Sequence, residues 1–270
     1  MHPENSDGHI LPPGETLSDA PPAPEPWTLL DLLFFVIFFL AALFVTGFLG
    51  LAGYRLLKPI MGWHGSAQAL GKNTFFLLGA QLVFYVLVFG YVYFLVVFRY
   101  HLRFWQGIHW GRLTARGVER YVALGVVMTV GVQLLPAFLP DKSHFPLEKL
   151  FSSPDSSYAM AAFAVIVAPF MEELIFRGVL FSVFEARVGL AFAIIVTAVL
   201  FAAMHIPEYN GAWDHVFLIF LVGFILSLTR GLTRSLAPSV VLHITYNACL
   251  MIGLFVATSH FRLMQGLVWK

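Results

Sequence analysis

The sequence predicts an all-α fold, a polytopic transmembrane helical bundle of about seven spans, and three observations predict it. Hydrophobic residues make up 59% of the 270 residues. Charged residues make up only 11%, about half the share that is usual in soluble domains. The apolar residues form repeated runs of about 20, the length that crosses the hydrocarbon layer as a helix. Because lipid offers the backbone no hydrogen-bond partners, each run is expected to be helical.

The first 26 residues differ in composition from the rest of the chain. They contain five acidic residues and four closely spaced prolines, Pro21, Pro22, Pro24 and Pro26, but no lysine or arginine. This composition predicts a disordered acidic, proline-rich tail over residues 1–26. The tail lacks the basic segment and cleavage site of a signal peptide. Residues 27–270 are expected to form a single membrane domain.

Three spans are predicted in the first half of the chain. The first begins at Trp27, an aromatic residue of the kind that favours the membrane interface, and ends at Gly53. The third is ended by Pro136 and Pro140, because proline cannot continue a helix. The three predicted ranges are 27–53, 74–98 and 118–139.

Four further spans are predicted in the second half. The first of them runs for about 30 residues, which at a rise of about 1.5 Å per residue exceeds the bilayer core, so it should tilt or project. The next is expected to stop at Pro207. The four predicted ranges are 158–188, 190–206, 213–228 and 236–258.

Two of the connecting segments have unusual composition. Residues 99–120 contain five arginines, with Trp105 and Trp110 among them, and are interpreted as a basic segment lying on anionic lipid. A substrate-docking arm is the alternative for this segment. Its density of arginine favours a cytoplasmic position. The polar, proline-containing segment 140–157 is predicted to cap a site.

The composition also excludes some classes of protein and partner. The net charge is only +1 and no run of lysine or arginine is present, so no nucleic-acid partner is expected. Cys249 is the single cysteine, which excludes an intrachain disulfide. The lipid bilayer is the expected environment, and the expected location is a cell membrane of the bacterial inner-membrane type.

Ionisable residues gather in the later spans, where each costs at least about 2.5–3.5 kcal/mol at a helix centre. Glu172 and Glu173 lie midway along the long fourth span, and Arg177 follows Glu173 by four residues. A spacing of four places Glu173 and Arg177 on one helix face. Glu172 then points about 100° away. Two adjacent carboxylates in a low-dielectric site do not both ionise easily, which suits a general base. A purely structural ion pair is the alternative.

Two further pairs with a spacing of four follow in the chain. Phe201 and His205 lie in the fifth span, and His243 and Asn247 lie in the seventh. Histidine can orient water or bind metal, and asparagine can donate to an oxyanion. Hydrogen bonding between helices is the alternative function of such residues.

The three pairs are predicted to converge on one cavity. A carboxylate with two imidazoles can activate water for attack on an amide, with or without a metal. The H-E-x-x-H arrangement of soluble zinc proteases is absent. Ser239 precedes His243 by four residues but lacks the G-x-S-G setting of a serine mechanism.

At these residues the sequence resembles the CAAX prenyl protease and bacteriocin-processing (CPBP) family of intramembrane proteases, relatives of the type II CAAX prenyl endopeptidases. The E-E-x-x-x-R motif matches Glu172, Glu173 and Arg177. The F-x-x-x-H motif matches Phe201 and His205, and H-x-x-x-N matches His243 and Asn247. The match covers residues 157–258, and the motifs occur in the family's order.

The resemblance implies an endopeptidase that cuts a membrane-associated protein or peptide, with a role for each motif residue. Glu172 would activate water with the help of His205, while Glu173 and Arg177 would orient and balance that centre. His243 and Asn247 would hold the oxyanion. Phe201 is assigned to substrate binding.

The sequence allows more than one cofactor assignment and more than one function. The family resemblance allows zinc, held by Glu172, His205 and His243, or a metal-independent glutamate mechanism. A membrane scaffold or regulatory protein with the same polar cluster is the alternative to a protease. A proton-coupled transporter ranks last, because no inverted repeat is visible.

Overall fold

The computed structural model describes residues 27–62, 65–135, 153–209 and 212–262. The predicted tail, 1–26, lies outside these ranges, as does most of the segment 140–157 that was predicted to cap a site. The part of the chain that is described contains helices and connecting turns but no strand. This agrees with the predicted all-α class.

Within the described ranges, seven helices are long and apolar enough to cross a membrane, which confirms the predicted number of spans. The protein is therefore a multi-pass membrane protein. In chain order the spans are α1 (Leu29–Met61), α3 (Thr74–Phe94) continued by η1 (Leu95–Arg99), α5 (Ala115–Leu134), the continuous helix from Pro154 to Val188, α9 (Leu190–Tyr209), α10 (Trp213–Thr233) and α11 (Leu236–Ala257).

Several predicted helix ends are wrong. α1 continues past Gly53 to Met61, with Pro59 inside its last turns, and α9 continues past Pro207 to Tyr209. A proline near the C-terminus of a helix removes one N–H from the hydrogen-bond ladder, and a few further residues can still follow. α5 begins at Ala115 because the Thr114 side chain caps it, accepting from the Gly117 N–H at 3.1 Å.

The predicted long fourth helix is confirmed as one continuous element. It consists of α6 (Pro154–Ala162), η4 (Phe163–Val167), α7 (Ala168–Glu173), η5 (Leu174–Leu180) and α8 (Phe181–Val188). The segments η4 and η5 are π-helical. π-Helical turns are rare and occur often at functional sites. The short segment α7, which carries both glutamates, lies between the two.

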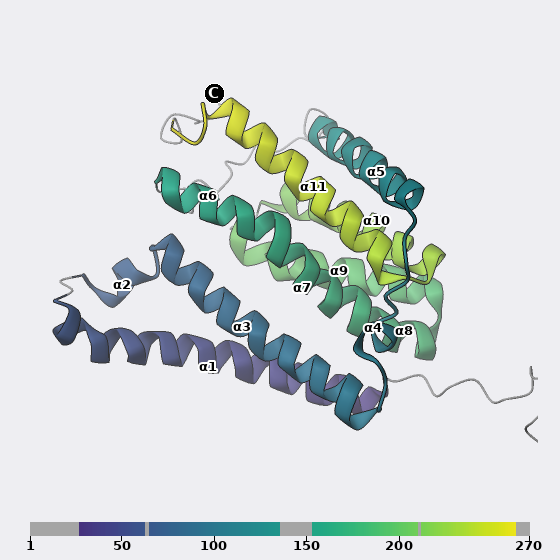
Figure 1. Cartoon of the computed structure of the whole chain (residues 1–270), viewed down its shortest axis with the longest axis horizontal. Coiled ribbons are helices and arrows are strands. Elements are labelled where there is room, and N and C mark those ends of the chain that lie inside the picture. The colour runs from purple at the N-terminus through teal and green to yellow at the C-terminus, as the bar shows by residue number, and fades with distance from the viewer. Residues whose placement is uncertain (1–26, 63–64, 136–152, 210–211, 263–270) are drawn as a thin grey trace, which may run out of the picture.

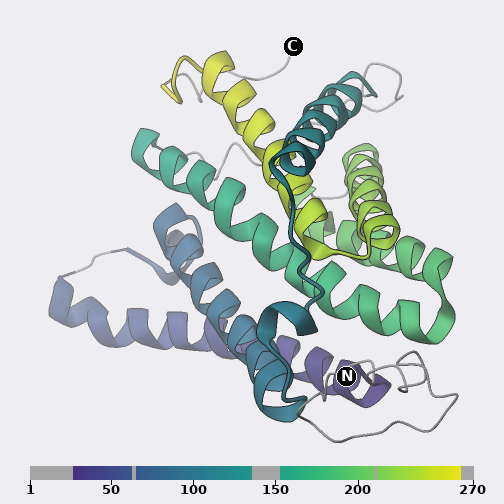
Figure 2. The same cartoon turned by 45° about the vertical axis from the view of Figure 1, so that its right-hand side comes forward.

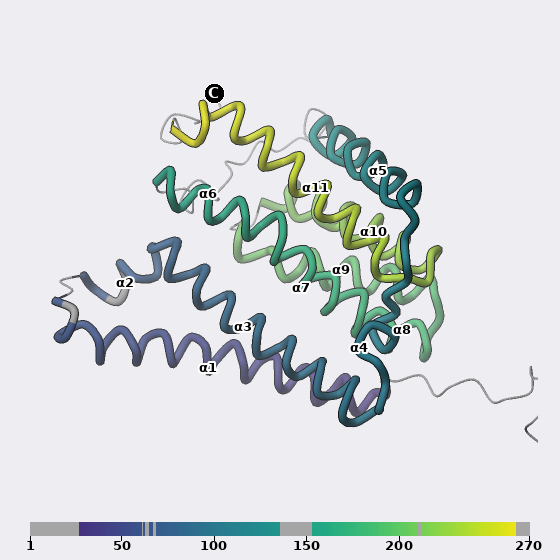
Figure 3. The backbone as a smooth tube through the Cα atoms, viewed as in Figure 1, coloured from purple at the N-terminus to yellow at the C-terminus, as the bar shows by residue number. Residues whose placement is uncertain are grey.

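The long helix runs through the middle of the bundle (Figures 1 and 2). α9 packs against α10 on one side of it, and α5 packs against α11 on another. α1 and α3 form a hairpin that lies along a third side, as the tube trace shows (Figure 3). These three helix pairs therefore lie on different sides of the long helix.

A buried carboxylate joins the two helices of this hairpin. Asp31, which is 1% exposed, forms an ion pair with Arg99 over 3.1 Å. It also accepts hydrogen bonds from the Tyr100 hydroxyl and from the backbone N–H of Thr28. The capped start of α1 is thereby fixed to the end of η1.

The segment after η1 is a loop only up to Thr114. It contains the short helix α4 (Phe104–Gly107), and Arg116 and Arg120 lie in α5, which corrects the predicted loop 99–120. The loop is anchored to the start of α11, because the Leu236 N–H donates to the His109 carbonyl at 2.9 Å. A Cβ atom at Gly111 would lie 2.6 Å from the Ser235 hydroxyl, so this close approach requires glycine.

Candidate active site

The predicted pairing of Glu173 and Arg177 is present. Arg177 Nη1 donates to Glu173 Oε1 at 2.9 Å, and both side chains are completely buried. Charges so deep in a membrane bundle are stable only when they are paired and hydrogen-bonded. Arg177 also donates to the Gly223 carbonyl at 2.7 Å and to the Ser227 hydroxyl at 3.2 Å. The guanidinium therefore ties the long helix to α10.

Aromatic packing completes the surroundings of the guanidinium. The Arg177 guanidinium carbon lies 4.7 Å from the centre of the Phe201 ring, within the range of a cation–π contact. Behind it, Thr197 Oγ1 lies 3.0 Å from the Ser227 hydroxyl. α9 and α10 thus hold the arginine on two sides, and its position is fixed.

His243 connects the two glutamates. Its Nδ1 lies 3.0 Å from Glu173 Oε1, and its Nε2 lies 3.7 Å from Glu172 Oε2. An ionised carboxylate only accepts hydrogen bonds, so Nδ1 carries the proton that points to Glu173. Nε2 therefore faces Glu172 across a gap slightly longer than a hydrogen bond.

The two adjacent carboxylates have different surroundings. The Glu173 side chain is 0% exposed, whereas that of Glu172 is 21% exposed. The charge of Glu173 is neutralised by Arg177, and its Oε1 also accepts a hydrogen bond from His243. Glu172 faces more open space, as the predicted rotation of one helical step requires. Of the two, Glu172 is the carboxylate that a water molecule can reach.

The ring of Phe201 lies between the two histidines. Its centre is 4.8 Å from the centre of the His205 ring and 5.8 Å from that of His243. His205 Nδ1 lies 2.8 Å from the Phe201 carbonyl oxygen, so that nitrogen donates. Phe201 itself is 2% exposed. It therefore fixes both imidazoles, and its assignment to substrate binding stays a prediction.

Asn247 joins α11 to the π-helical segment η4. Its Nδ2 donates to the Ala164 carbonyl at 2.8 Å. A side-chain amide carries two N–H donors, and this contact commits one of them. The role of Asn247 at the oxyanion stays a prediction.

Several residues near the site were not predicted from the sequence. Glu208 and Tyr85 lie within electrostatic range of Glu172, and the Ser239 hydroxyl lies close to Glu173. The unpredicted partners of Arg177 are Ser227 and the Gly223 carbonyl. Small polar residues inside the apolar runs of α9 and α10 were the available signal in the sequence.

The motif-bearing helices match a known family. Residues 154–249 match the family described as type II CAAX prenyl endopeptidase, Rce1-like. The matched segment, called the Rce1-like domain below for this similarity, covers 96 of the 270 residues. This domain includes all three residue pairs, and its bounds agree with the predicted range of 157–258.

A curated relative extends the comparison. The chain is 34% identical over 138 residues to an Escherichia coli protein described as an uncharacterized 24.3 kDa protein. The aligned part covers 49% of this chain and 62% of the relative. The chain thus spans about three fifths of the length of the curated relative that it matches. No solved structure matches the chain.

As far as the structure describes it, the Rce1-like domain offers fewer converging donors than the three protein ligands that a catalytic zinc ion needs. Among the described residues, no three His, Cys, Asp or Glu side chains converge as metal ligands. Glu172 and His243 approach each other, but His205 does not complete a three-ligand set with them. The arrangement does not fit zinc held by Glu172, His205 and His243 together, and zinc stays a prediction.

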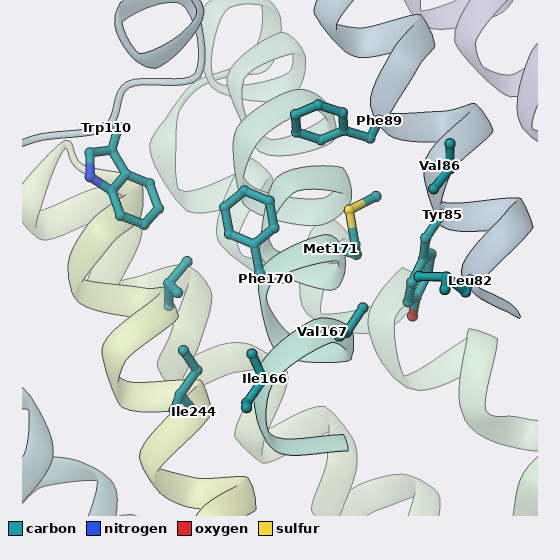
Figure 4. A pocket seen from close by; sticks show the side chains of 11 residues that line it. Leu82, Tyr85, Val86, Phe89, Trp110, Ile166, Val167, Phe170, Met171 and Ile244 are labelled. Atoms are coloured by element: carbon teal, nitrogen blue, oxygen red, sulfur yellow. The ribbon is translucent and has the colours of Figure 1, made fainter. Parts of the chain in front are cut away.

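An apolar groove of about 560 Å³ is lined in part by residues that precede Glu172 in the chain (Figure 4). Side chains from α3, the long helix, α11 and the loop before α5 line it, among them Val86, Phe89, Trp110, Phe170, Met171 and Ile244. Met171 and Phe170 directly precede Glu172 in the chain. Tyr85, which also lines the groove from α3, lies within electrostatic range of Glu172.

Proposed function

We propose that this protein is an intramembrane endopeptidase that hydrolyses a peptide bond in a membrane-associated peptide or protein. The observation that carries the proposal is the position of His243 between a buried, neutralised Glu173 and a more accessible Glu172. The Rce1-like domain supports the same class of reaction. In this assignment Glu172 is the general base.

The chemical step uses the difference between the two glutamates. A water molecule between Glu172 and the substrate carbonyl loses a proton to Glu172 as its oxygen bonds to the carbonyl carbon. The protonated Glu172 then gives that proton to the leaving amine when the C–N bond breaks. Glu173 and Arg177 take no part in bond making, and they hold His243 in one orientation.

Charge on the substrate oxygen is stabilised from α11. With Nδ1 held by Glu173, Nε2 of His243 faces the space beside Glu172, where an N–H on Nε2 would donate to the oxyanion. Donors fixed before the reaction stabilise an oxyanion without reorganisation. The second N–H of Asn247 supplies a further donor one helical turn along. His205 lies beside Phe201 and assists in orienting the water.

The apolar groove indicates the class of substrate. Aromatic and aliphatic side chains line it from α3 to α11, so a charged soluble peptide gains nothing by entering. A lipid-modified or strongly apolar segment could bury its hydrocarbon there. Each Å² of apolar surface removed from water stabilises the complex by about 25 cal/mol. The peptide bond of that segment would then lie next to Met171 and Glu172.

Cleavage of defined peptides tests the proposal. Purified protein in liposomes would receive labelled peptides with and without a lipid chain, and mass spectrometry would locate any cut. We expect cleavage of the lipid-modified peptides by the natural protein and none by Glu172→Ala. Equal cleavage by both proteins would contradict the proposal. A folded protein that cuts neither peptide class, and whose Glu172→Ala variant restores function in cells, would favour the scaffold alternative.

Metal analysis on the same preparation separates the two mechanisms. Zinc would be quantified in the purified protein, and activity would be measured with and without a strong chelator. Loss of both zinc and activity, restored by added zinc, would support the metalloprotease assignment. Full activity in zinc-free protein would support the glutamate mechanism described above.

A further inference from the structure

A second pocket lies at another part of the fold and is polar. It encloses about 510 Å³ between α8, the start of α9, the end of α10 and the loop before α5. Leu190 lines it, whereas His205 lies 15 residues farther along α9, a distance of about 22 Å along a helix. The pocket is therefore separate from the candidate active site.

The pocket walls carry more positive than negative charge. The lining contains two arginines, Arg230 and Arg234, and one carboxylate, Glu185, and His109 and the Ser182 hydroxyl add further polar groups. Guanidinium groups bind phosphate oxygens with two parallel hydrogen bonds. The composition of the lining thus fits a phosphate group rather than a cation or a neutral sugar.

Several of these groups are held in place before any ligand arrives. Arg230 is 1% exposed, its guanidinium lies 5.3 Å from the Phe181 ring centre, and its Nη2 lies 3.5 Å from the Ser182 hydroxyl. His109 has a φ of 56°, and its carbonyl is bonded to the Leu236 N–H. Fixed donors lower the entropic cost of binding.

The pocket lies at the ends of membrane-spanning helices, where lipid headgroups are expected. It lies where three spans end or begin, and exposed apolar residues are close to its lining residues in the chain, with Val188 54% and Leu232 71% exposed. Basic pockets between helix ends bind anionic lipid headgroups.

We propose that this pocket binds the phosphate of an anionic phospholipid, whose acyl chains lie along the apolar surface beside Leu190. The two guanidinium groups hold the phosphate, and His109 adds a further donor. The Ser182 hydroxyl donates to the Gly178 carbonyl at 2.9 Å and accepts from Arg230, so it helps to position that guanidinium. Binding at this pocket does not depend on the proposed protease activity.

Lipid retention by the purified full-length protein tests the proposal. The protein in neutral detergent would be mixed with phosphatidylglycerol, with phosphatidylcholine or with inorganic phosphate. Native mass spectrometry would count the retained molecules, and thermal unfolding would report stabilisation. We expect retention of phosphatidylglycerol with a raised Tm, and little retention of phosphatidylcholine.

Substitution of single arginines inside and outside the pocket tests whether the lipid binds there. Arg234→Asn should weaken phosphatidylglycerol binding at least about tenfold, the effect of losing one charge-assisted hydrogen-bond partner. Arg234 is exposed and has a φ of 52°, a conformation that asparagine tolerates, so this variant should fold. Arg230→Gln should weaken binding further, whereas Arg187→Gln, an exposed arginine that does not line the pocket, should bind normally.

Three results would overturn the proposal. Equal retention of both lipids would show that charge is not recognised. Equal loss of binding in Arg187→Gln and Arg234→Asn would show general surface attraction. Stabilisation by inorganic phosphate as strong as that by phosphatidylglycerol, without retained lipid, would exclude a lipid as the source of the phosphate.

Discussion

His243 Nδ1 lies 3.0 Å from Glu173 Oε1, and this contact sets the orientation of the imidazole in the candidate site. The same carboxylate oxygen accepts from Arg177 at 2.9 Å. One buried oxygen thus receives donors from the long helix and from α11. The opposite nitrogen of His243 is left facing Glu172.

Removing the charge of Glu173 should destabilise the protein. In Glu173→Gln the shape is kept, but Arg177 stays buried without its counter-charge, which costs about 3–5 kcal/mol. The free energy of unfolding in a mixed-micelle denaturant titration measures this loss. Glu119→Gln, at an exposed position on α5, is the control and should change stability by less than about 0.5 kcal/mol. Equal stability of the two variants would contradict the pairing.

Shortening Phe201 should slow the reaction without weakening substrate binding. Phe201→Leu loses the ring that lies between His205 and His243, so both imidazoles gain freedom. A small misplacement of catalytic groups can cost up to about 100-fold in rate, and we expect kcat to fall at least about tenfold with KM nearly unchanged. Steady-state kinetics measure both constants.

The same experiment separates the two roles assigned to Phe201. A raised KM with unchanged kcat would instead place the ring in contact with substrate. Phe217→Leu is the matched control, because Phe217 lies on α10 and is 48% exposed. Its kinetics should equal those of the natural protein.

Filling the apolar groove should discriminate against bulky substrates. Val86 lines the groove from α3 and is 62% exposed, so Val86→Trp occupies space without disturbing the core. We expect KM for a lipid-modified peptide to rise about tenfold, with less change for a peptide without the lipid. Val127→Trp, on α5 and 67% exposed, is the control. If both variants raised KM equally, the groove would not be the place where the lipid-modified substrate binds.

Neutralising Asp31 should loosen the α1–α3 hairpin. Asp31→Asn weakens the contacts to Arg99 and Tyr100 and leaves polar groups imperfectly paired, which costs about 1–3 kcal/mol. Thermal unfolding in detergent measures the loss as a lower Tm. Asp155→Asn, at an exposed position in the first turn of α6, should have a smaller effect. If both variants unfold at the same temperature, the Asp31 contacts do not fix the hairpin.

The sequence predicts the features that depend on local geometry. Seven spans follow from the apolar runs, and the Glu173–Arg177 contact follows from a spacing of four on a helix. The rotation that separates Glu172 from Glu173 also follows from the helical repeat. These features need no knowledge of how the helices pack.

Contacts between distant segments could not be predicted in this way. Arg177 bonds to Gly223 and Ser227, which lie 46 and 50 residues away. Asn247 bonds to a carbonyl 83 residues away. Such partners depend on which helix faces meet, and the helical repeat of one segment does not contain that information. The π-helical segments that flank α7 were likewise absent from the sequence pattern.

The activity of Glu172→Gln tests the central claim most directly. The amide keeps the size of the side chain but cannot take a proton from water, so cleavage of a lipid-modified peptide should fall by about 10²–10⁴-fold. Glu172→Gln should unfold at nearly the same Tm as the natural protein, and Glu119→Gln should retain full activity. Cleavage by Glu172→Gln at the natural rate would contradict the assignment of Glu172 as the general base.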